Sequence, residues 1–432
     1  MAVWHEAGIR RLPLGRTLNG TKGVSALRIS TRALATITAL AGLALLTGCT
    51  SAAAAGWQDA GTLPSSKASA AASITAPADG ATNVSTATEI ALSGSVKVSL
   101  TDGSGTAIDG APRADGSTWV PTTQLKYGTT YTATAGGKKV TFTTMNRPGN
   151  LVSVSTPLED DQVYGVAMPM VVRLDRPVPK DQWANVERRL FVHSEPAQEG
   201  SWYWFSGTEL HYRPMEYWQE GTKLSVRLAT GGLSFGGNAY GAADLTIRAT
   251  IGAKLLMVTD NATHTMTVTK NDQVLKTIPI SLGKPSKPSS SGAMVVISKA
   301  QSELFVGTDP GDSYRTTVYW TQRLTWGGEY IHAAPWSVGD QGRRNVSHGC
   351  TNMSTENAKW LWGLTRIGDP VIVKGTGVKL EWGNGYTDWD RPWAEYLKGS
   401  ALPHPAPSAP SAGPSGASAS GATSPAASPS AR

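Results

Sequence analysis

Hydrophobic and polar residues alternate along much of the chain, beginning with the stretch from Ile74 to about Thr144. The segments SVKVSL, TYTATA and KVTFTT each place apolar side chains on every second position, and Asp-Gly and Gly-Gly pairs separate them. Period-two alternation between turn residues is typical of short antiparallel strands with one buried face. The same pattern returns between residues 150 and 250, in VVRLD, LFVHS, ELHYRP and KLSVRLA. We therefore expect two small β-sandwiches.

An internal repeat supports this division. At an offset of 93 positions, Trp119, Pro121, Leu125, Gly128, Thr129 and Tyr131 correspond to Tyr212, Pro214, Trp218, Gly221, Thr222 and Leu224. A period close to 100 residues built from strands fits two immunoglobulin-like sandwiches in tandem, over residues 74–148 and 149–250. The aromatic run Trp202–Phe205 is best interpreted as sandwich core, with stacking on carbohydrate as the alternative.

A third domain is predicted over residues 251–375. KLLMVTD, THTMTVTK and QVLKTIPI are expected strands, with Asn271-Asp272 as the turn between the last two. One helix is indicated after Ser354, a suitable N-cap, because Ala358, Leu361, Trp362 and Thr365 recur at helical spacing. The fold class is thus mainly β: two sandwiches in tandem followed by a β-rich domain with one packed helix.

The two ends of the chain have a different composition. Residues 1–49 combine basic residues with an apolar run from Ala33 to Leu46, which is too short to cross a membrane and predicts an export signal. Leu46-Thr47-Gly48-Cys49 resembles a bacterial lipobox, which implies lipidation of Cys49; an ordinary cleaved signal is the alternative. Residues 50–73 are predicted to be a flexible tether and residues 401–432 a disordered Pro/Ala/Ser tail. We therefore expect a protein anchored by lipid to the outer face of the cytoplasmic membrane, facing the cell wall.

Charge and cysteine content narrow the possible functions. The net charge of +7 is partly concentrated in the first 32 residues, and no basic stripe interleaved with aromatics follows, so nucleic acid is not an expected partner. Only two cysteines occur, Cys49 and Cys350. A single disulfide between them is possible, but each cysteine lies in a more specific motif of its own.

The motif around Cys350 carries the candidate chemistry. His348 lies two positions before this cysteine, and His332 lies eighteen positions before it (350 minus 332). A thiol becomes a nucleophile when a base takes its proton, and glycines such as Gly349 let backbone N–H groups approach a substrate closely. Cysteine, histidine and exposed backbone donors are together the components of a cysteine acyl-transfer site.

Ile331-His332 followed by Ser347-His348-Gly349-Cys350-Thr351-Asn352 resembles the active-site signature of the L,D-transpeptidases, the YkuD-type catalytic domain. The segment AAPWS that follows His332 resembles the actinobacterial members in particular. The resemblance covers about Ser73 to Ser400, and it implies that the Trp-rich residues 376–400 form a short C-terminal subdomain packed on the catalytic domain. It implies cross-linking of peptidoglycan stem peptides, a donor tetrapeptide and an acceptor stem, through a Cys350 thioester, with 3→3 links and acylation by carbapenems. No cofactor is implied.

The resemblance also assigns roles to individual residues. Cys350 is the expected nucleophile and His332 the general base, its ring oriented by the carbonyl of the next residue, which is Ala333 here where many relatives have Ser. His348 is expected to support the loop, with polarisation of the substrate as the alternative. The N–H groups of Gly349 and Cys350 are expected to face an oxyanion. The expected substrate-binding residues are Tyr314, Gly327, Gly328, Trp336 and Asn352; Tyr314 as core packing and Asn352 as a turn residue are the alternatives. Arg343 and Arg344 are equally consistent with attracting carboxylates and with a solvated loop.

Three alternatives stay open at this stage. His332, His348 and Cys350 could ligate zinc, although the paired spacing of structural zinc sites is missing. The same catalytic residues could release a tripeptide as an L,D-carboxypeptidase, or attach a protein to the wall. A non-catalytic wall-binding lipoprotein, with the sandwiches as its active part, belongs to a different class.

Overall fold

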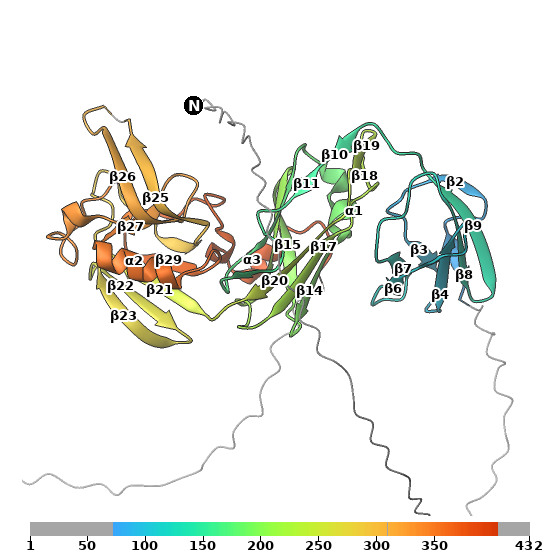
Figure 1. The fold of residues 1–432 in the computed structure, drawn as a ribbon, viewed down its shortest axis with the longest axis horizontal. Helices are drawn as coiled ribbons and strands as arrows, with labels where there is room; N and C mark the ends of the chain where they lie inside the picture. Colours follow the sequence, from blue (N-terminus) through green and yellow to red (C-terminus); the bar gives the residue numbers. More distant parts are fainter. Residues whose placement is uncertain (1–71, 309, 405–432) are drawn as a thin grey trace, which may run out of the picture. The chain divides into compact units, whose positions relative to one another are not determined.

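The computed structural model describes residues 72–308 and 310–404. The predicted export signal, Cys49, almost all of the tether and most of the C-terminal tail therefore lie outside the described residues. Within the described residues, no helix combines the length and the apolar character needed to cross a bilayer. Strands dominate the chain, as the alternating pattern predicts (Figure 1).

The first sandwich is built from two sheets. One has the order β1-β3-β7-β6 and the other β2-β9-β8-β4-β5. Their bounds are β1 Ile74–Ala76, β2 Ala81–Val84, β3 Ile90–Leu92, β4 Val98–Asp102, β5 Ala107–Ile108, β6 Gly110–Pro112, β7 Thr118–Pro121, β8 Thr130–Ala135 and β9 Lys138–Thr144. Both sheets contribute to one core, which includes Ile90 and Trp119 from one sheet and Tyr131 and Phe142 from the other.

The second sandwich follows the same scheme. Its sheets are β11-β13-β16-β15 and β12-β20-β17-β14, with a small sheet β10-β19-β18 beside them. The bounds are β10 Leu151–Val152, β11 Val154–Ser155, β12 Gln162–Tyr164, β13 Met170–Leu174, η1 Lys180–Gln182, α1 Trp183–Glu187, β14 Leu190–Glu195, β15 Gly200–Ser206, β16 Glu209–Pro214, β17 Lys223–Leu228, β18 Ser234–Gly236, β19 Ala239–Gly241 and β20 Leu245–Ile251.

The repeat seen in the sequence marks equivalent core positions. Leu125 and Trp218 are both buried in the loop after the strands β7 and β16, at 3% and 2% exposure. Tyr131 in β8 and Leu224 in β17 are likewise buried. A conserved spacing of core residues thus accompanies a repeated strand order, which explains why the repeat was visible without the structure.

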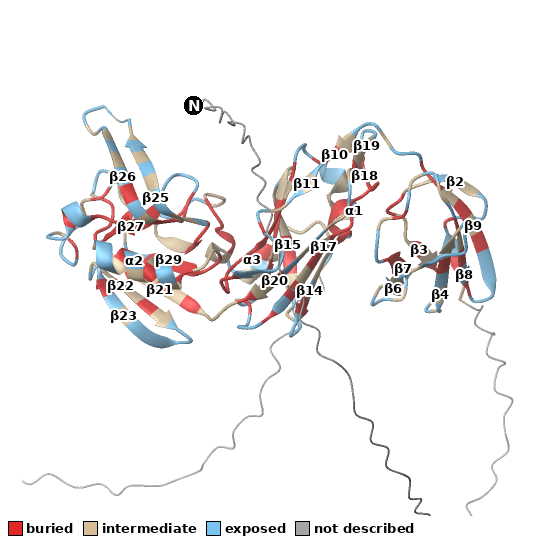
Figure 2. Ribbon diagram, viewed as in Figure 1, coloured by how far each residue is buried: buried red, intermediate tan, exposed pale blue. Residues whose placement is uncertain are grey.

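The third domain contains two further sheets and one packed helix. A five-stranded sheet has the order β23-β22-β21-β29-β24, and a four-stranded sheet has the order β25-β26-β27-β28. The bounds are β21 Leu255–Asp260, β22 Thr265–Lys270, β23 Gln273–Pro279, β24 Gly292–Val295, β25 Ser298–Gly307, β26 Tyr314–Arg323, β27 Tyr330–Ala333, η2 Pro335–Ser337, β28 Thr351–Met353, α2 Thr355–Leu364 and β29 Pro370–Lys374. Figure 2 shows β23, at the edge of the five-stranded sheet, as mostly exposed, whereas most residues of β29 are buried.

Local signals of this domain act as the sequence predicts. Asn271 and Asp272 both have positive φ, 49° and 64°, and join β22 to β23 in a two-residue hairpin. The Ser354 side chain accepts a hydrogen bond from the Asn357 N–H at 3.2 Å and caps α2. The helix buries Ala358 and Leu361 in the same core as β21, β22 and β27.

The C-terminal segment contains η3 (Asp388–Asp390) and α3 (Trp393–Leu397). It contacts the third domain, where Asp390 Oδ1 accepts from the Ala293 N–H at 2.9 Å. It also packs on the second sandwich: Asp388 Oδ1 lies 3.1 Å from Nδ1 of the buried His211. The sequence indicated only the first of these two contacts.

The aromatic run Trp202–Phe205 is accounted for by packing. Trp202 and Trp204 are buried in the core of the second sandwich. Tyr203 and Phe205 face the other side of β15, where their rings lie 5.2 and 4.9 Å from that of Trp382 in the C-terminal segment. The carbohydrate-stacking alternative therefore has no exposed aromatic platform at these four positions.

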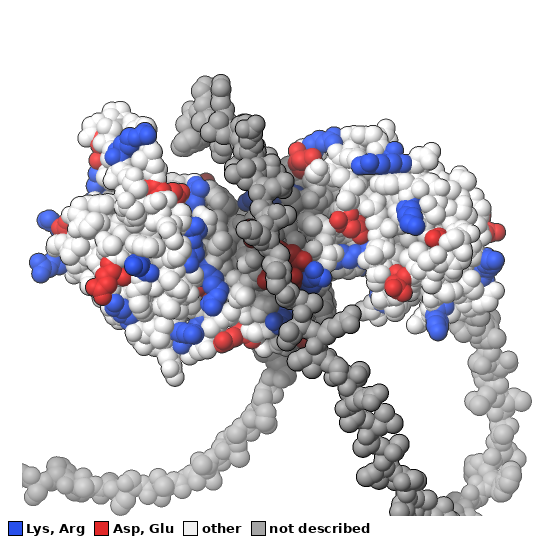
Figure 3. All heavy atoms as spheres, in the orientation of Figure 1, with Lys and Arg blue, Asp and Glu red and all other residues white. Residues whose placement is uncertain are grey.

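Positive and negative side chains both occur over the face drawn in Figure 3.

Candidate active site

The four-stranded sheet brings the distant histidine and the cysteine together. Strands β27 and β28 run parallel as neighbours, with Ile331 paired to Thr351 and His332 paired to Asn352. Cys350 immediately precedes β28. The register of this one strand pair therefore closes the eighteen-residue gap between His332 and Cys350.

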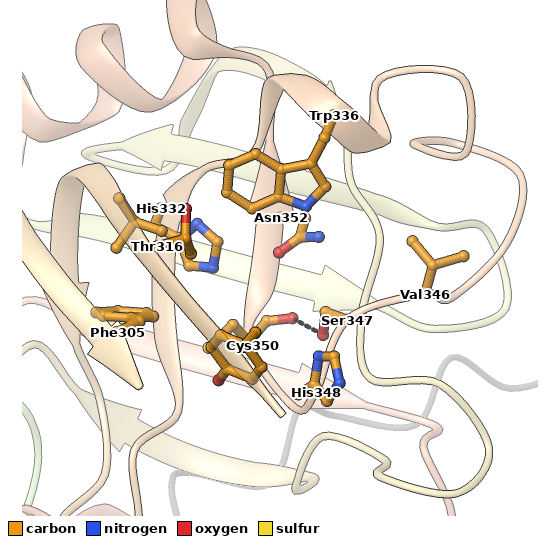
Figure 4. Close-up of a pocket in the computed structure, with 11 residues that line it drawn as sticks. Phe305, Thr316, His332, Trp336, Val346, Ser347, His348, Cys350 and Asn352 are labelled. Atoms are coloured by element: carbon orange, nitrogen blue, oxygen red, sulfur yellow. Dashed lines mark hydrogen bonds between the residues drawn. The ribbon is translucent and has the colours of Figure 1, made fainter. Parts of the chain in front are cut away.

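Both side chains line a cavity of about 370 Å³ (Figure 4). Its walls come from the β25–β26 hairpin, from β27 and η2, and from the loop before β28. The lining residues are Phe305, Tyr314, Thr316, Val318, His332, Trp336, Val346, Ser347, His348, Cys350 and Asn352. The predicted nucleophile and the predicted base thus share one concave site.

The His332 ring is fixed by its surroundings. It is 4% exposed, and its Nδ1 lies 2.9 Å from the Ala333 carbonyl oxygen, to which it donates. The Phe305 ring meets it edge-on at 5.4 Å, and the Trp336 ring lies 6.2 Å away. With Nδ1 protonated, Nε2 carries the free lone pair and can accept a proton. Burial lowers the pKa of His332, so the ring is a neutral base near pH 7.

The Cys350 thiol is protonated in the resting site. Cys350 is 8% exposed, and burial raises the pKa of its thiol to about 12. Sγ lies 3.6 Å from the Gly328 carbonyl oxygen, to which the S–H can donate. The N-terminus of α2 follows Cys350 in the sequence and its field favours a thiolate, but burial outweighs that effect. The resting pair is therefore a neutral thiol and a neutral imidazole.

Hydrogen bonds fix the turn that carries the nucleophile. Ser347 Oγ donates to the Cys350 carbonyl at 2.6 Å, and Ser289 Oγ donates to the Gly349 carbonyl at 2.7 Å. Gly349 has φ of +118°, a conformation that favours glycine. Ser289 comes from the loop after β23, so a segment distant in sequence holds the turn in place.

The expected oxyanion donors differ in availability. The Gly349 N–H donates to Ser347 Oγ at 3.1 Å. The Cys350 N–H makes no hydrogen bond among the residues that the structure describes. An incoming oxyanion therefore meets a free donor at Cys350, whereas the Gly349 donor becomes available only when its bond to Ser347 breaks.

His348 connects the cysteine turn to the tip of the β25–β26 hairpin. Its Nε2 lies 2.8 Å from Oδ1 of Asp312, and the Tyr314 ring lies 4.9 Å from its ring. Lys284 Nζ binds the other oxygen of the same carboxylate at 2.6 Å. His348 thus supports the loop geometry, as the sequence suggested, and Asp312 and Lys284 are additional members that the sequence did not indicate.

Asn352 is held from two directions. Its backbone exchanges hydrogen bonds with Ser281, and its Nδ2 donates to Ser337 Oγ at 3.2 Å. Gln341 Nε2 donates to the same serine oxygen at 3.2 Å. Asn352 lines the cavity from this fixed position, which fits contact with a bound peptide better than a turn role, because Asn352 lies within β28.

The other predicted substrate-binding residues occupy two different places. Tyr314 and Trp336 line the cavity, and Trp336 is 59% exposed at its rim. Gly327 and Gly328 are exposed and do not line it. Gly328 instead contacts the sulfur through its carbonyl, while the Gly327 N–H donates to Asn384 Oδ1 at 2.8 Å.

The sequence did not indicate two other residues of the site, Glu329 and Ser290. Glu329 precedes β27, and its carboxylate accepts hydrogen bonds from the Ser290 N–H and from Ser290 Oγ, the latter at 2.7 Å. No motif marks either residue, because their proximity to Cys350 depends on how the loop after β23 folds over the cysteine turn.

Within the described residues, no group of three or more His, Cys, Asp or Glu side chains is arranged to hold a metal ion.

Two family models match parts of the chain. A family model described as the L,D-transpeptidase catalytic domain matches residues 254–373, and a model of a bacterial Ig domain matches residues 78–234, which span parts of both sandwiches. The chain is 33% identical over 319 residues to L,D-transpeptidase 2 of Mycobacterium tuberculosis strain CDC 1551, covering 70% of this chain and 78% of that protein.

Two further similarities were found. The chain is 33% identical over 326 residues to L,D-transpeptidase 5 of Mycobacterium tuberculosis strain H37Rv, covering 72% of each protein. A solved structure of the L,D-transpeptidase LdtMt1 in complex with imipenem is 34% identical, with a TM-score of 0.45, over 52% of this chain and all of that chain.

Proposed function

Because this chain belongs to the L,D-transpeptidase family, we propose that it forms 3→3 cross-links in peptidoglycan through a Cys350 thioester. The donor is a tetrapeptide stem, which loses its terminal D-alanine, and the acceptor is the side-chain amine of the third residue of another stem. The single observation that carries the proposal is the shared cavity of Cys350 and a His332 ring whose Nδ1 is held by the Ala333 carbonyl.

The acylation step begins from the neutral pair. As Cys350 Sγ attacks the carbonyl carbon of the donor's third residue, His332 Nε2 takes the thiol proton. The C–N bond to D-alanine then breaks, and the imidazolium returns that proton to the departing amine. A neutral imidazole with a free Nε2 suits both transfers, since it begins as a base and ends as one.

The developing oxyanion requires donors in place before the reaction. The free N–H of Cys350 is the first donor, and that of Gly349 becomes the second once it leaves Ser347 Oγ. Losing one such donor typically costs about 3–4 kcal/mol of transition-state stabilisation.

The fate of the thioester separates the main candidate from its enzymatic alternatives. Attack by a stem amine gives a cross-linked dimer, whereas attack by water gives a tripeptide and defines an L,D-carboxypeptidase. An amine on a protein would attach that protein to the wall. The non-catalytic alternative, in which the sandwiches alone act on the wall, leaves the organised Cys350 site without a purpose.

The same nucleophile supports reaction with β-lactams. A carbapenem presents a strained amide to Sγ, and ring opening leaves an acyl group on Cys350 without a leaving amine. We expect carbapenems to acylate the enzyme at this residue.

Location of the enzyme is a separate part of the proposal. Lipidation of Cys49 would anchor the protein on the outer face of the cytoplasmic membrane, with the tether and sandwiches extending the catalytic domain toward the wall. Metabolic labelling with a fatty-acid analogue tests this directly: label in the wild type and not in Cys49→Ala supports an anchor, and label in neither removes it.

Product analysis tests the proposed reaction. The purified enzyme is incubated with a disaccharide tetrapeptide whose third residue carries a free side-chain amine, and products are identified by mass spectrometry. Dimers linked between third residues are expected, and Cys350→Ala should form none. Formation of tripeptide without dimer by the wild type would assign a carboxypeptidase. If the wild type formed neither dimer nor tripeptide, the proposal would be overturned.

A further inference from the structure

A carboxylate stands beside the nucleophile without a part in acylation. Glu329 is half-buried, and its two oxygens accept from the Ser290 N–H at 3.2 and 3.3 Å, with Ser290 Oγ at 2.7 Å from one of them. A Cβ placed on Gly349 would lie 3.8 Å from Glu329 Cγ, and nothing else would be as near. The glycine next to Cys350 thus leaves a space that faces this side chain.

This space is distinct from the cavity that contains His332. Gly328, Glu329 and Ser290 do not line that cavity, although the Gly328 carbonyl lies 3.6 Å from Cys350 Sγ. A Cβ on Gly328 would meet no atom within 4 Å, and this residue is exposed. Gly328 therefore leaves the backbone open to solvent on the Glu329 side of the sulfur, whereas Gly349 is buried next to the Glu329 side chain.

The charge of Glu329 opposes the first half of the reaction. Burial is the main cause of the raised pKa of Cys350, and the Glu329 carboxylate raises that pKa further. A negative charge here disfavours both the thiolate and the oxyanion of a tetrahedral intermediate. A negative charge beside the sulfur instead favours the binding of a cation. The acceptor in the second half of the proposed reaction is such a cation, because its side-chain amine is an ammonium ion in water.

We propose that Glu329 is the recognition point for the acceptor, binding the side-chain ammonium of the incoming stem peptide in the open space beside Gly328. The inference rests on the proposed function, and it names the residue that favours aminolysis of the thioester over hydrolysis. Ser290 holds the carboxylate in position through its N–H and its hydroxyl.

The proton balance of this step is complete within the site. The acceptor ammonium gives one proton to the Glu329 carboxylate, and the neutral amine attacks the thioester carbonyl. As the new C–N bond forms and the C–S bond breaks, the second proton passes from nitrogen through His332 Nε2 to Sγ. Glu329 then releases its proton to water. Burial raises the pKa of the Glu329 carboxyl, which makes it a stronger base for the first transfer.

A purely structural role is the rival explanation, because the same bonds to Ser290 also hold the loop after β23. The experiment must therefore report on the acceptor alone. Acylation is followed by the mass gain on exposure to a carbapenem, and transfer by the ratio of dimer to tripeptide as the acceptor concentration is raised.

Glu329→Gln keeps the shape and removes the charge. We expect carbapenem acylation to be at least as fast as in the wild type. The acceptor concentration that gives half-maximal transfer should rise about tenfold or more, because one hydrogen bond to a charged group is lost. Glu329→Asp should restore part of the transfer. Glu356→Gln, which neutralises an exposed carboxylate in the first turn of α2, is the matched control and should change neither quantity.

Hydroxylamine is an acceptor that is uncharged near pH 7, so it distinguishes recognition of a charged acceptor by Glu329 from a structural role of Glu329. Glu329→Gln should react with it as fast as the wild type does. An unchanged dimer-to-tripeptide ratio in Glu329→Gln, or an equal loss with hydroxylamine and with the stem peptide, would overturn the inference. If Glu329→Gln does not fold, Ser290→Ala should show a smaller loss of the same kind, and no loss there would also overturn it. A wild type that is neither acylated nor able to form dimers would instead overturn the proposed function.

Discussion

Nδ1 of His332 lies 2.9 Å from the carbonyl oxygen of Ala333, the residue that follows it. This bond fixes the tautomer of the ring and leaves Nε2 free to face the cavity that it shares with Cys350. A backbone carbonyl provides the acceptor, so the orientation of the ring does not require a hydroxyl at position 333. Ala333 is therefore compatible with catalysis.

Replacing the base should remove most of the activity. His332→Gln keeps a polar side chain of similar length but has no nitrogen that can take up the thiol proton. We expect kcat to fall by about 10²- to 10⁴-fold, the usual contribution of a general base. His193→Gln, at an exposed position of β14, is the control and should leave the rate of dimer formation unchanged.

The pH profile follows from the two perturbed groups. Burial lowers the pKa of His332 below its ordinary 6.5, so the neutral, active form of the base persists below that pH. The acid limb of kcat/KM should accordingly have its midpoint below pH 6.5. The pKa of the Cys350 thiol is raised to about 12, so the thiol itself should produce no limb between pH 7 and 9. A thiolate absorbance that appears near pH 7 would contradict this description of the resting pair.

Asp312 ties the tip of the β25–β26 hairpin to the loop after β23 and to the cysteine turn. Its carboxylate contacts Lys284 Nζ at 2.6 Å, Lys287 Nζ at 3.3 Å and His348 Nε2 at 2.8 Å. Asp312→Asn removes the charge that all three contacts share. We expect faster hydrogen–deuterium exchange in peptides from the hairpin, measured by mass spectrometry. Asp340→Asn, which loses only the pairing with Arg344, should leave exchange in the hairpin unaltered.

Asp369 makes the stability of the catalytic domain depend on pH. Its side chain is fully buried before β29, one oxygen accepts from the Arg366 N–H at 2.7 Å, and the other has no partner in the described residues. Burial raises the pKa of this carboxyl from 3.8 to about 7. The folded state therefore holds a proton that the unfolded chain releases, and stability is lost as the pH rises from about 4 through 7.

Asp369→Asn should abolish that dependence. The loss in the wild type is about 1.4 kcal/mol for each unit that separates the folded from the unfolded pKa. The melting temperature of the variant minus that of the wild type should consequently be larger at pH 8 than at pH 5. If this difference is the same at both pH values, Asp369 is not protonated in the folded protein.

Much of this architecture could be predicted because its signals are local. The Asn271-Asp272 hairpin and the Ser354 cap each depend on a few adjacent residues, and the alternation of apolar positions depends only on the faces of single strands. Cys350 and His332 were identified from the motif, and the parallel pairing of β27 with β28 supplies the geometry that the motif implies.

The remaining features arise from contacts between distant segments. Ser289 and Ser290 reach the cysteine turn because the loop after β23 folds over it, and the sequence of that loop indicates only glycine- and proline-rich character. From the sequence, Glu329 is an ordinary carboxylate at the start of a strand, and only the folded loop after β23 brings Ser290 to it. The pairing of Asp388 with His211, 177 positions apart, likewise depends on how the C-terminal segment packs against the second sandwich. No local pattern encodes these relationships.

The mass of the intact protein after exposure to a carbapenem tests the central claim most directly. The wild type should gain the mass of one carbapenem molecule, with the adduct located by peptide mapping to the peptide that contains Cys350, and Cys350→Ala should gain nothing. An adduct of the same mass on Cys350→Ala, or no adduct on the folded wild type, would contradict the assignment of Cys350 as the acylated nucleophile.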